Sequence, residues 1–143
     1  MKIAFALFCS LFICSFNSPI PNQANLKVGN LDFDLGGDIR IQVFKKQPID
    51  MLTEMEPVVK LKVTLEKALF IKLPELAPGE YLIAVFHDSN KNGKMDYSFF
   101  GSPREGFGFS GEFYCNKKNA APETHYIWLN SGTQDITVNI CYR

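Results

Sequence analysis

The sequence has little of what several common functions require. Its 143 residues carry 15 basic and 15 acidic side chains, so there is no broad electrostatic field to hold a nucleic-acid backbone or an anionic membrane. Histidine occurs only at His87 and His125, and no serine or cysteine lies in a motif that supplies a nucleophile with its base. The composition therefore argues against nucleic-acid binding and gives no positive sign of catalysis.

Long apolar runs are also lacking, except at the very start of the chain. One positive charge precedes the apolar residues 3–16, a pattern typical of a secretory signal peptide and short for a membrane span. We predict a signal peptide within residues 1–24, cleaved after Ser15 or Ala24; lipidation at Cys14 or an uncleaved anchor are the alternatives. We expect the remaining protein to be secreted or periplasmic, with no membrane span in the mature chain.

Cysteine is scarce in the expected mature domain, residues 25–143. Only Cys115 and Cys141 remain there once the signal peptide is removed. Because disulfides persist in oxidising compartments, we favour a Cys115–Cys141 bridge over two unrelated thiols. Such a bridge would close a loop of roughly 27 residues and stabilise the domain by about 3 kcal/mol in the chain-entropy model.

Helical periodicity is missing as well, and period-two alternation of apolar and polar residues dominates the chain. This alternation predicts strands with one face in a core and one in water, whereas residues 81–87 are apolar on both faces, as in a central strand. Strands are expected at residues 27–33, 38–43, 60–66, 69–73, 81–87, 126–129 and 135–142. About seven short strands in one domain predict an all-β, antiparallel β-sandwich of immunoglobulin-like or transthyretin-like type, with a small barrel as the alternative.

Turn-forming residues separate the expected strands. Residues 35–38, Leu-Gly-Gly-Asp, are typical of a tight hairpin between the first two strands. Residues 78–79, Pro-Gly, suit a turn before the central strand, and residues 130–132 join the last two strands. The connection at residues 48–57 has room for one helical turn.

One segment carries a metal-binding pattern. Residues 88–96 match D-x-N-x-N-G-x-x-D, the spacing of the ligand loop in an EF-hand. Hard oxygens at alternating positions fit Ca²⁺, which takes six to eight such ligands. The expected ligands are the side chains of Asp88, Asn90, Asn92 and Asp96 and the carbonyl of Lys94, with Gly93 at the sharp bend.

The match to this pattern has a gap. The position of the bidentate Glu is Phe99, and Glu105 is the candidate to supply the missing carboxylate from the next loop. We therefore expect weak calcium binding, with a Kd on the order of 10⁻⁴ to 10⁻³ M, as in extracellular modules. The alternative is a plain polar connection, in which Asn92 and Gly93 form a tight turn and Asp88 caps it.

Glycine and aromatic residues alternate in the segment that follows, residues 99–111. Phe107 and Phe109 are candidates for a surface that stacks on a sugar or a peptide; the alternative is a long loop pinned by its own Phe side chains. Residues 106–111 also fit G-x-G-x-x-G literally. They open no expected helix, so we predict no dinucleotide site there.

These two segments carry a family resemblance. Two segments resemble the secreted bacterial family catalogued as domain of unknown function 2141. They are residues 78–96, which contain P-G-E-Y and F-H-D-x-N-x-N-G-x-x-D, and residues 101–110, which read G-x-P-x-E-G-F-G-F-S. The resemblance implies a small exported β-sandwich, often a signal peptide plus one domain, in which the acidic loop and the glycine–aromatic loop belong together. It implies no established activity. After Ser110 the sequence departs from the family pattern.

The leading functional hypothesis is a non-enzymatic binding module with a low-affinity calcium loop and an unknown protein or carbohydrate ligand. One alternative is an ion-free structural or adhesive domain. Another is a carbohydrate-active enzyme that uses Asp88, Asp96 and Glu105 as an acid–base set. A carrier of apolar cargo between the sheets is a further possibility, given the 13 phenylalanines.

Overall fold

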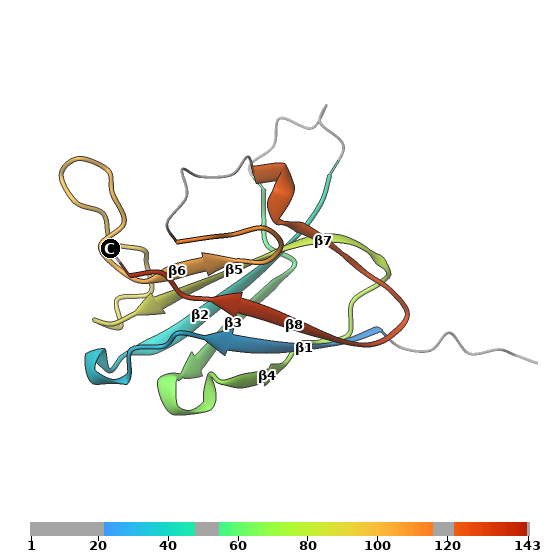
Figure 1. Cartoon of the computed structure of the whole chain (residues 1–143), viewed down its shortest axis with the longest axis horizontal. Coiled ribbons are helices and arrows are strands. Elements are labelled where there is room, and N and C mark those ends of the chain that lie inside the picture. The colour runs from blue at the N-terminus through green and yellow to red at the C-terminus, as the bar shows by residue number, and fades with distance from the viewer. Residues whose placement is uncertain (1–21, 48–54, 116–121, 143) are drawn as a thin grey trace, which may run out of the picture.

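The computed structural model describes residues 22–47, 55–115 and 122–142 (Figure 1). They form eight strands in two sheets, which confirms the predicted all-β sandwich. The strands are β1 (Asn22–Gly29), β2 (Asp38–Lys45), β3 (Val59–Thr64), β4 (Phe70–Lys72), β5 (Gly79–Asp88), β6 (Phe107–Phe109), β7 (Tyr126–Leu129) and β8 (Gly132–Asn139). Three short 3-10 helices accompany them, η1 (Phe33–Leu35), η2 (Leu65–Lys67) and η3 (Pro122–His125). None of the helices within these described ranges is long and apolar enough to cross a membrane.

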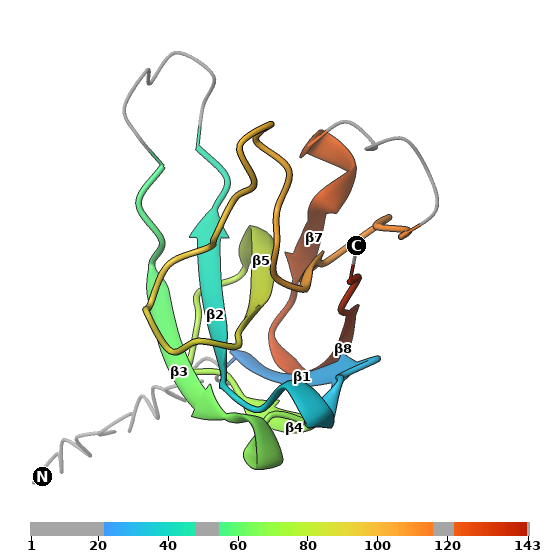
Figure 2. The same ribbon diagram turned by 90° about the vertical axis from the view of Figure 1, so that its left-hand side faces the viewer.

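The strands divide into a three-stranded sheet, in the order β4-β1-β8, and a five-stranded sheet built around β5 (Figures 1 and 2). In the larger sheet the order is β3-β2-β5-β6. β7 lies along the same edge of β5 as β6, opposite its first half, because β2 occupies the other edge. β5 is therefore the central strand that the apolar run at residues 81–87 predicts.

The core lies between the two sheets and follows the alternation in the sequence. On β5 the side chains of Tyr81, Ile83 and Val85 are buried, whereas Leu82, Ala84 and Phe86 are only half-buried on the outer face. The same alternation on the other strands completes the core with Leu26, Val28, Ile39, Ile41, Val43, Val138 and Ile140. Because burial of apolar surface contributes about 25 cal/mol per Å², this core is the main source of the stability of the fold.

Some sequence predictions about strands were wrong. The first strand spans Asn22–Gly29 rather than residues 27–33, and it pairs in parallel with β8, so the sandwich is not wholly antiparallel. Residues 35–38 do not close a hairpin, because β1 and β2 lie in different sheets and this segment crosses between them. The segment at residues 130–132 joins the last two strands as predicted, and it crosses from the larger sheet to the smaller one. The short strand β6 was not predicted at all.

Two expectations fall wholly or partly outside the described residues: the signal peptide and the helical turn within residues 48–57. Ala24, one of the two cleavage positions considered, is buried within β1, where it pairs with Gln134. Cleavage after Ala24 would therefore remove the first part of β1, whereas cleavage after Ser15 would leave the strand intact.

The predicted disulfide between Cys115 and Cys141 is confirmed, with 5.4 Å between the two Cα atoms. It ties the segment after β6 to the residues that follow β8. The backbones of Phe107 and Cys141 also form an isolated antiparallel bridge. The C-terminal residues are thereby held against the edge of the larger sheet.

We predict that the double substitution Cys115→Ser/Cys141→Ser lowers the free energy of unfolding by about 3 kcal/mol, because the unfolded chain regains the entropy of an open loop. Urea denaturation of the oxidised protein and the variant measures the difference. The unaltered protein reduced with dithiothreitol is the control and should unfold at the same midpoint as the double variant. Equal midpoints for the double variant and the oxidised protein would contradict the prediction.

Candidate functional site

The candidate site begins where β5 ends. Asp88 is fully buried, and its Oδ2 accepts hydrogen bonds from the Arg40 Nε on β2 and from the Gly93 amide, each at 2.9 Å. Its Oδ1 is buried and has no hydrogen-bond partner among the described residues. Leaving a buried carboxylate oxygen unpaired costs at least about 1–3 kcal/mol, so this atom calls for a positively polarised partner.

The loop after Asp88 is organised by its own polar side chains. The Oδ1 of Asn90 accepts the Asn92 amide at 3.0 Å, and the Oδ1 of Asn92 accepts the Lys94 amide at 2.8 Å. The side-chain Nδ2 groups of both asparagines donate to the Asp96 carboxylate at 2.6 to 3.0 Å. Gly93 has a φ of +82°, which a residue with a Cβ adopts only under strain.

Glu105 closes this loop from the next segment of chain. Its Oε1 accepts the Ser89 amide at 3.0 Å, and its Oε2 accepts the Asp96 amide at 3.2 Å. The side chain is only 7% exposed. One carboxylate thus bridges the beginning and the end of the loop, which the spacing of residues in the sequence does not reveal.

Hydrogen bonds join five of the expected ligand residues into one group: Asn90, Asn92, Lys94, Asp96 and Glu105. The Asp88 carboxylate bonds instead to Gly93 within the loop and to Arg40 on β2. Within the described ranges, no three His, Cys, Asp or Glu side chains form a group placed to hold a metal ion. An ion in this loop would thus depend on amide and carbonyl oxygens as well as carboxylates. The Arg40 guanidinium beside Asp88 supplies a competing positive charge.

His87 precedes Asp88 and is also fully buried. Its Nδ1 and the Tyr142 hydroxyl lie 2.8 Å apart, and its Nε2 is bonded to the carbonyl of Gly36. Burial raises the pKa of the Tyr142 phenol, so this hydroxyl stays protonated and can donate to the imidazole. Both ring nitrogens are therefore occupied, and His87 supports the strand end.

Phe107 and Phe109, the expected ligand-stacking residues, lie half-buried on the outer face of the larger sheet. In β6 they stand opposite Phe86 and Ala84 of β5. A groove of about 320 Å³ lies between this face and the candidate loop, residues 88–96. Its lining residues are Gln42, Ala84, Phe86, Gly93, Lys94, Met95, Tyr97, Pro103, Phe107 and Phe109. The sequence did not identify Phe86 or Tyr97 as part of this surface, although the apolar outer positions of β5 were a signal.

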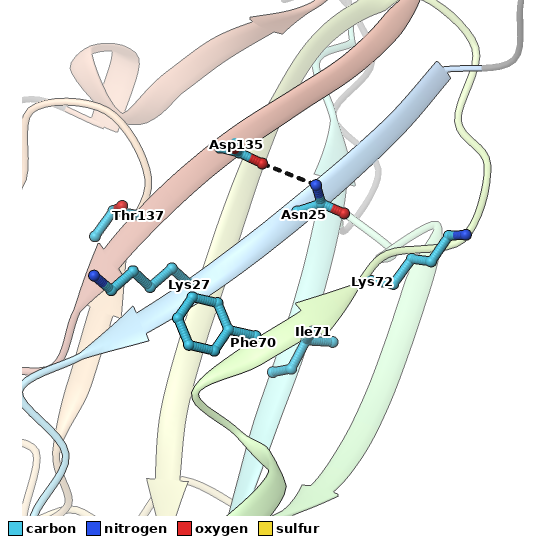
Figure 3. Close-up of a pocket in the computed structure, with 7 residues that line it drawn as sticks. All are labelled: Asn25, Lys27, Phe70, Ile71, Lys72, Asp135 and Thr137. Atoms are coloured by element: carbon cyan, nitrogen blue, oxygen red, sulfur yellow. Dashed lines mark hydrogen bonds between the residues drawn. The ribbon is translucent and has the colours of Figure 1, made fainter.

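A second depression lies on the outer face of the smaller sheet (Figure 3). There the Asn25 Nδ2 donates to Asp135 at 2.8 Å, and the Lys27 ammonium lies 5.8 Å from the centre of the Phe70 ring. These residues occupy the outward positions of β1, β4 and β8, where the alternation places polar side chains in water. The surface is adequately explained as a solvent-facing sheet.

Comparison with known proteins identifies a bacterial family. The family model described as an uncharacterized protein conserved in bacteria, domain of unknown function 2141, matches residues 27–137. No curated protein and no solved structure matches the chain. The matched range includes the end of β1, all of β2 to β7, the candidate loop and most of β8.

We predict that Glu105→Ala destabilises the protein by about 1–3 kcal/mol, because it leaves the Ser89 and Asp96 amides without an acceptor. Chemical denaturation measures the loss. Glu66→Ala, at an exposed position in η2, is the matched control and should change stability by less than about 0.5 kcal/mol. Equal, small effects of the two substitutions would show that Glu105 does not hold the loop.

Proposed function

This chain belongs to the bacterial family of domain of unknown function 2141, and we propose that it is an exported, non-enzymatic binding module whose acidic loop holds a weakly bound calcium ion. The ion would neutralise Asp88 and Asp96 and would fix the position of the segment that follows them. That segment borders the groove beside Phe107 and Phe109, where a protein or carbohydrate ligand would bind.

The unpaired Oδ1 of Asp88 is the observation that carries this proposal. The other oxygen of the same carboxylate accepts the amide of Gly93, five residues further on. One oxygen thus shapes the bend while the second is left for a cation. In a plain polar turn, both oxygens of a buried carboxylate are expected to be hydrogen-bonded.

The remaining donors suit calcium chemically. Each amide oxygen of Asn90 and Asn92 accepts one backbone N–H and has a second lone pair for an ion. The Asp96 carboxylate, now held by amide hydrogens, would exchange them for the stronger charge of the ion. The carbonyl of Lys94 is the further expected ligand. Glu105 uses both oxygens on backbone amides, which favours a role in shaping the loop.

An acid–base enzyme is less well supported by the same contacts. Asp88 is fully buried and ion-paired with Arg40, and Glu105 bridges two backbone amides, so neither carboxylate is placed to exchange protons with a substrate. The Ser110 hydroxyl donates to the main-chain carbonyl of His125 at 2.7 Å rather than to its imidazole. These groups therefore have structural roles, whereas a hydrolase would need them to contact its substrate.

Export is supported by the apolar segment at the start of the sequence and by the Cys115–Cys141 disulfide. Disulfides persist in oxidising compartments, where calcium is also available at millimolar concentrations that a weak site requires. These two features support our proposal that the protein acts in the periplasm or outside the cell.

We predict that about 10 mM calcium stabilises the protein by about 1.4 kcal/mol, if Kd is about 1 mM, and raises Tm by about 5 °C. Magnesium should have a smaller effect, because it demands a tighter octahedral site. Scanning calorimetry with calcium, with magnesium and with chelator measures the shifts.

The matched variants are Asp96→Asn and Asp34→Asn. The first removes an expected ligand and should abolish the calcium response, whereas the second removes an exposed carboxylate from η1 and should preserve it. Asp96 is preferred to the buried Asp88 because its replacement threatens folding less. A wild-type protein that does not respond to calcium, or an Asp96→Asn variant that responds fully, would reject the proposal.

A further inference from the structure

Two phenylalanines stand almost completely in water at the tip of a narrow loop. Phe99 is 98% exposed and Phe100 is 91% exposed, and their rings meet edge to face at 5.6 Å. Figures 1 and 2 both show this loop, drawn in gold, projecting away from the strands. Exposing two adjacent large apolar side chains forgoes their burial energy, which is unusual unless they have a partner.

The tip is held rigid by its own hydrogen bonds. The Gly101 amide donates to the Ser98 carbonyl at 2.9 Å, which closes a turn with the two phenylalanines at its centre. The Ser98 amide donates to the Ser102 carbonyl at 2.7 Å, and Tyr97 forms a β-bridge with Pro103. The rings are therefore presented on an ordered support, which lowers the entropy cost of docking them.

The chemistry of the loop changes in layers from its tip to its base. The apolar rings of Phe99 and Phe100 come first, and the 59% exposed Tyr97 lies two residues before Phe99. Lys94 lines the same groove as Tyr97 and Pro103, and Arg104 follows directly in the chain. A bilayer favours side chains in the same order: apolar groups in its acyl region, amphipathic aromatic groups at the boundary, and cationic groups among its headgroups.

From this order we infer that the Phe99–Phe100 tip inserts into the interface of a lipid bilayer and docks the domain reversibly on a membrane surface. The inference goes beyond the proposed calcium function and does not depend on it, because the turn is closed by its own backbone bonds. The alternative is that the tip binds in a pocket on a partner protein. The layered order favours the membrane, because a pocket for two rings needs no cationic residues at a second depth.

The test places a tryptophan at the tip and removes the natural one. Phe100→Trp is made in a Trp128→Phe background, and Phe70→Trp in the same background is the control, since Phe70 is 75% exposed on the smaller sheet. Vesicles of equimolar phosphatidylcholine and phosphatidylglycerol are added to the full chain. Both proteins keep the same N-terminal residues, so any affinity of that segment is common to both.

We expect the tryptophan emission of the Phe100→Trp protein to move to shorter wavelength with vesicles, and that of the control to stay constant. No shift at the tip, or equal shifts in both proteins, would overturn the inference. So would a tip shift that needs no vesicles and grows with protein concentration, because the tip would then be meeting another protein molecule.

A second measurement removes the two phenylalanine rings of the tip by substitution. The double substitution Phe99→Ser/Phe100→Ser should weaken partitioning onto the same vesicles by about a hundredfold or more, because two rings no longer leave water. Phe70→Ser should leave partitioning unchanged. Equal partitioning of the double variant and the unaltered protein would refute insertion of the tip, whatever the calcium response of the loop.

Discussion

The buried carboxylate of Asp88 is the constraint on which the candidate site depends. A charge at the end of a central strand must be paired, because an isolated buried ion costs several kcal/mol. Arg40 supplies the pairing from the neighbouring strand, and the Gly93 amide supplies a hydrogen bond from the loop. These two contacts fix where the loop leaves the sheet and which way it bends, while the second carboxylate oxygen is left unpaired.

The acidic loop and the glycine–aromatic segment belong together for a physical reason. Glu105 reaches back to both ends of the loop, and β6 then pairs with β5 directly after it. Positions 106 and 108 accept only glycine because other parts of the chain lie too close to them. A Cβ on Gly108 would lie 2.3 Å from the Asn139 carbonyl oxygen, and one on Gly106 would lie 2.3 Å from the Tyr142 ring. The disulfide at Cys141 holds the C-terminal residues in the position that imposes this close approach.

Much of this arrangement could be predicted from the sequence. The alternation of apolar residues predicted the central strand and the sandwich, and the pattern of an exported protein with two remaining cysteines predicted the disulfide. The position of β1 was missed because its first residues, Asn22 to Asn25, are mostly polar and form a strand through long-range pairing with β8 and, at Asn25, with β4. β6 was missed because a three-residue Phe-Gly-Phe strand has too little pattern of its own.

The loop spacing predicted a cluster of polar residues after β5, and hydrogen bonds join Asn90, Asn92 and Asp96 there. Spacing alone does not show what each oxygen contacts. The role of Glu105 and the exposure of Phe99 depend on how the chain folds back, and both required the structure. Whether the gathered oxygens bind an ion is decided most directly by following backbone amides in ¹H–¹⁵N NMR spectra during a calcium titration. The account predicts saturable shifts centred on residues 88–96, largest at the Gly93 amide, with the smaller sheet unaffected. Shifts that never saturate, or that are spread evenly over acidic residues such as Asp34 and Asp135, would contradict it.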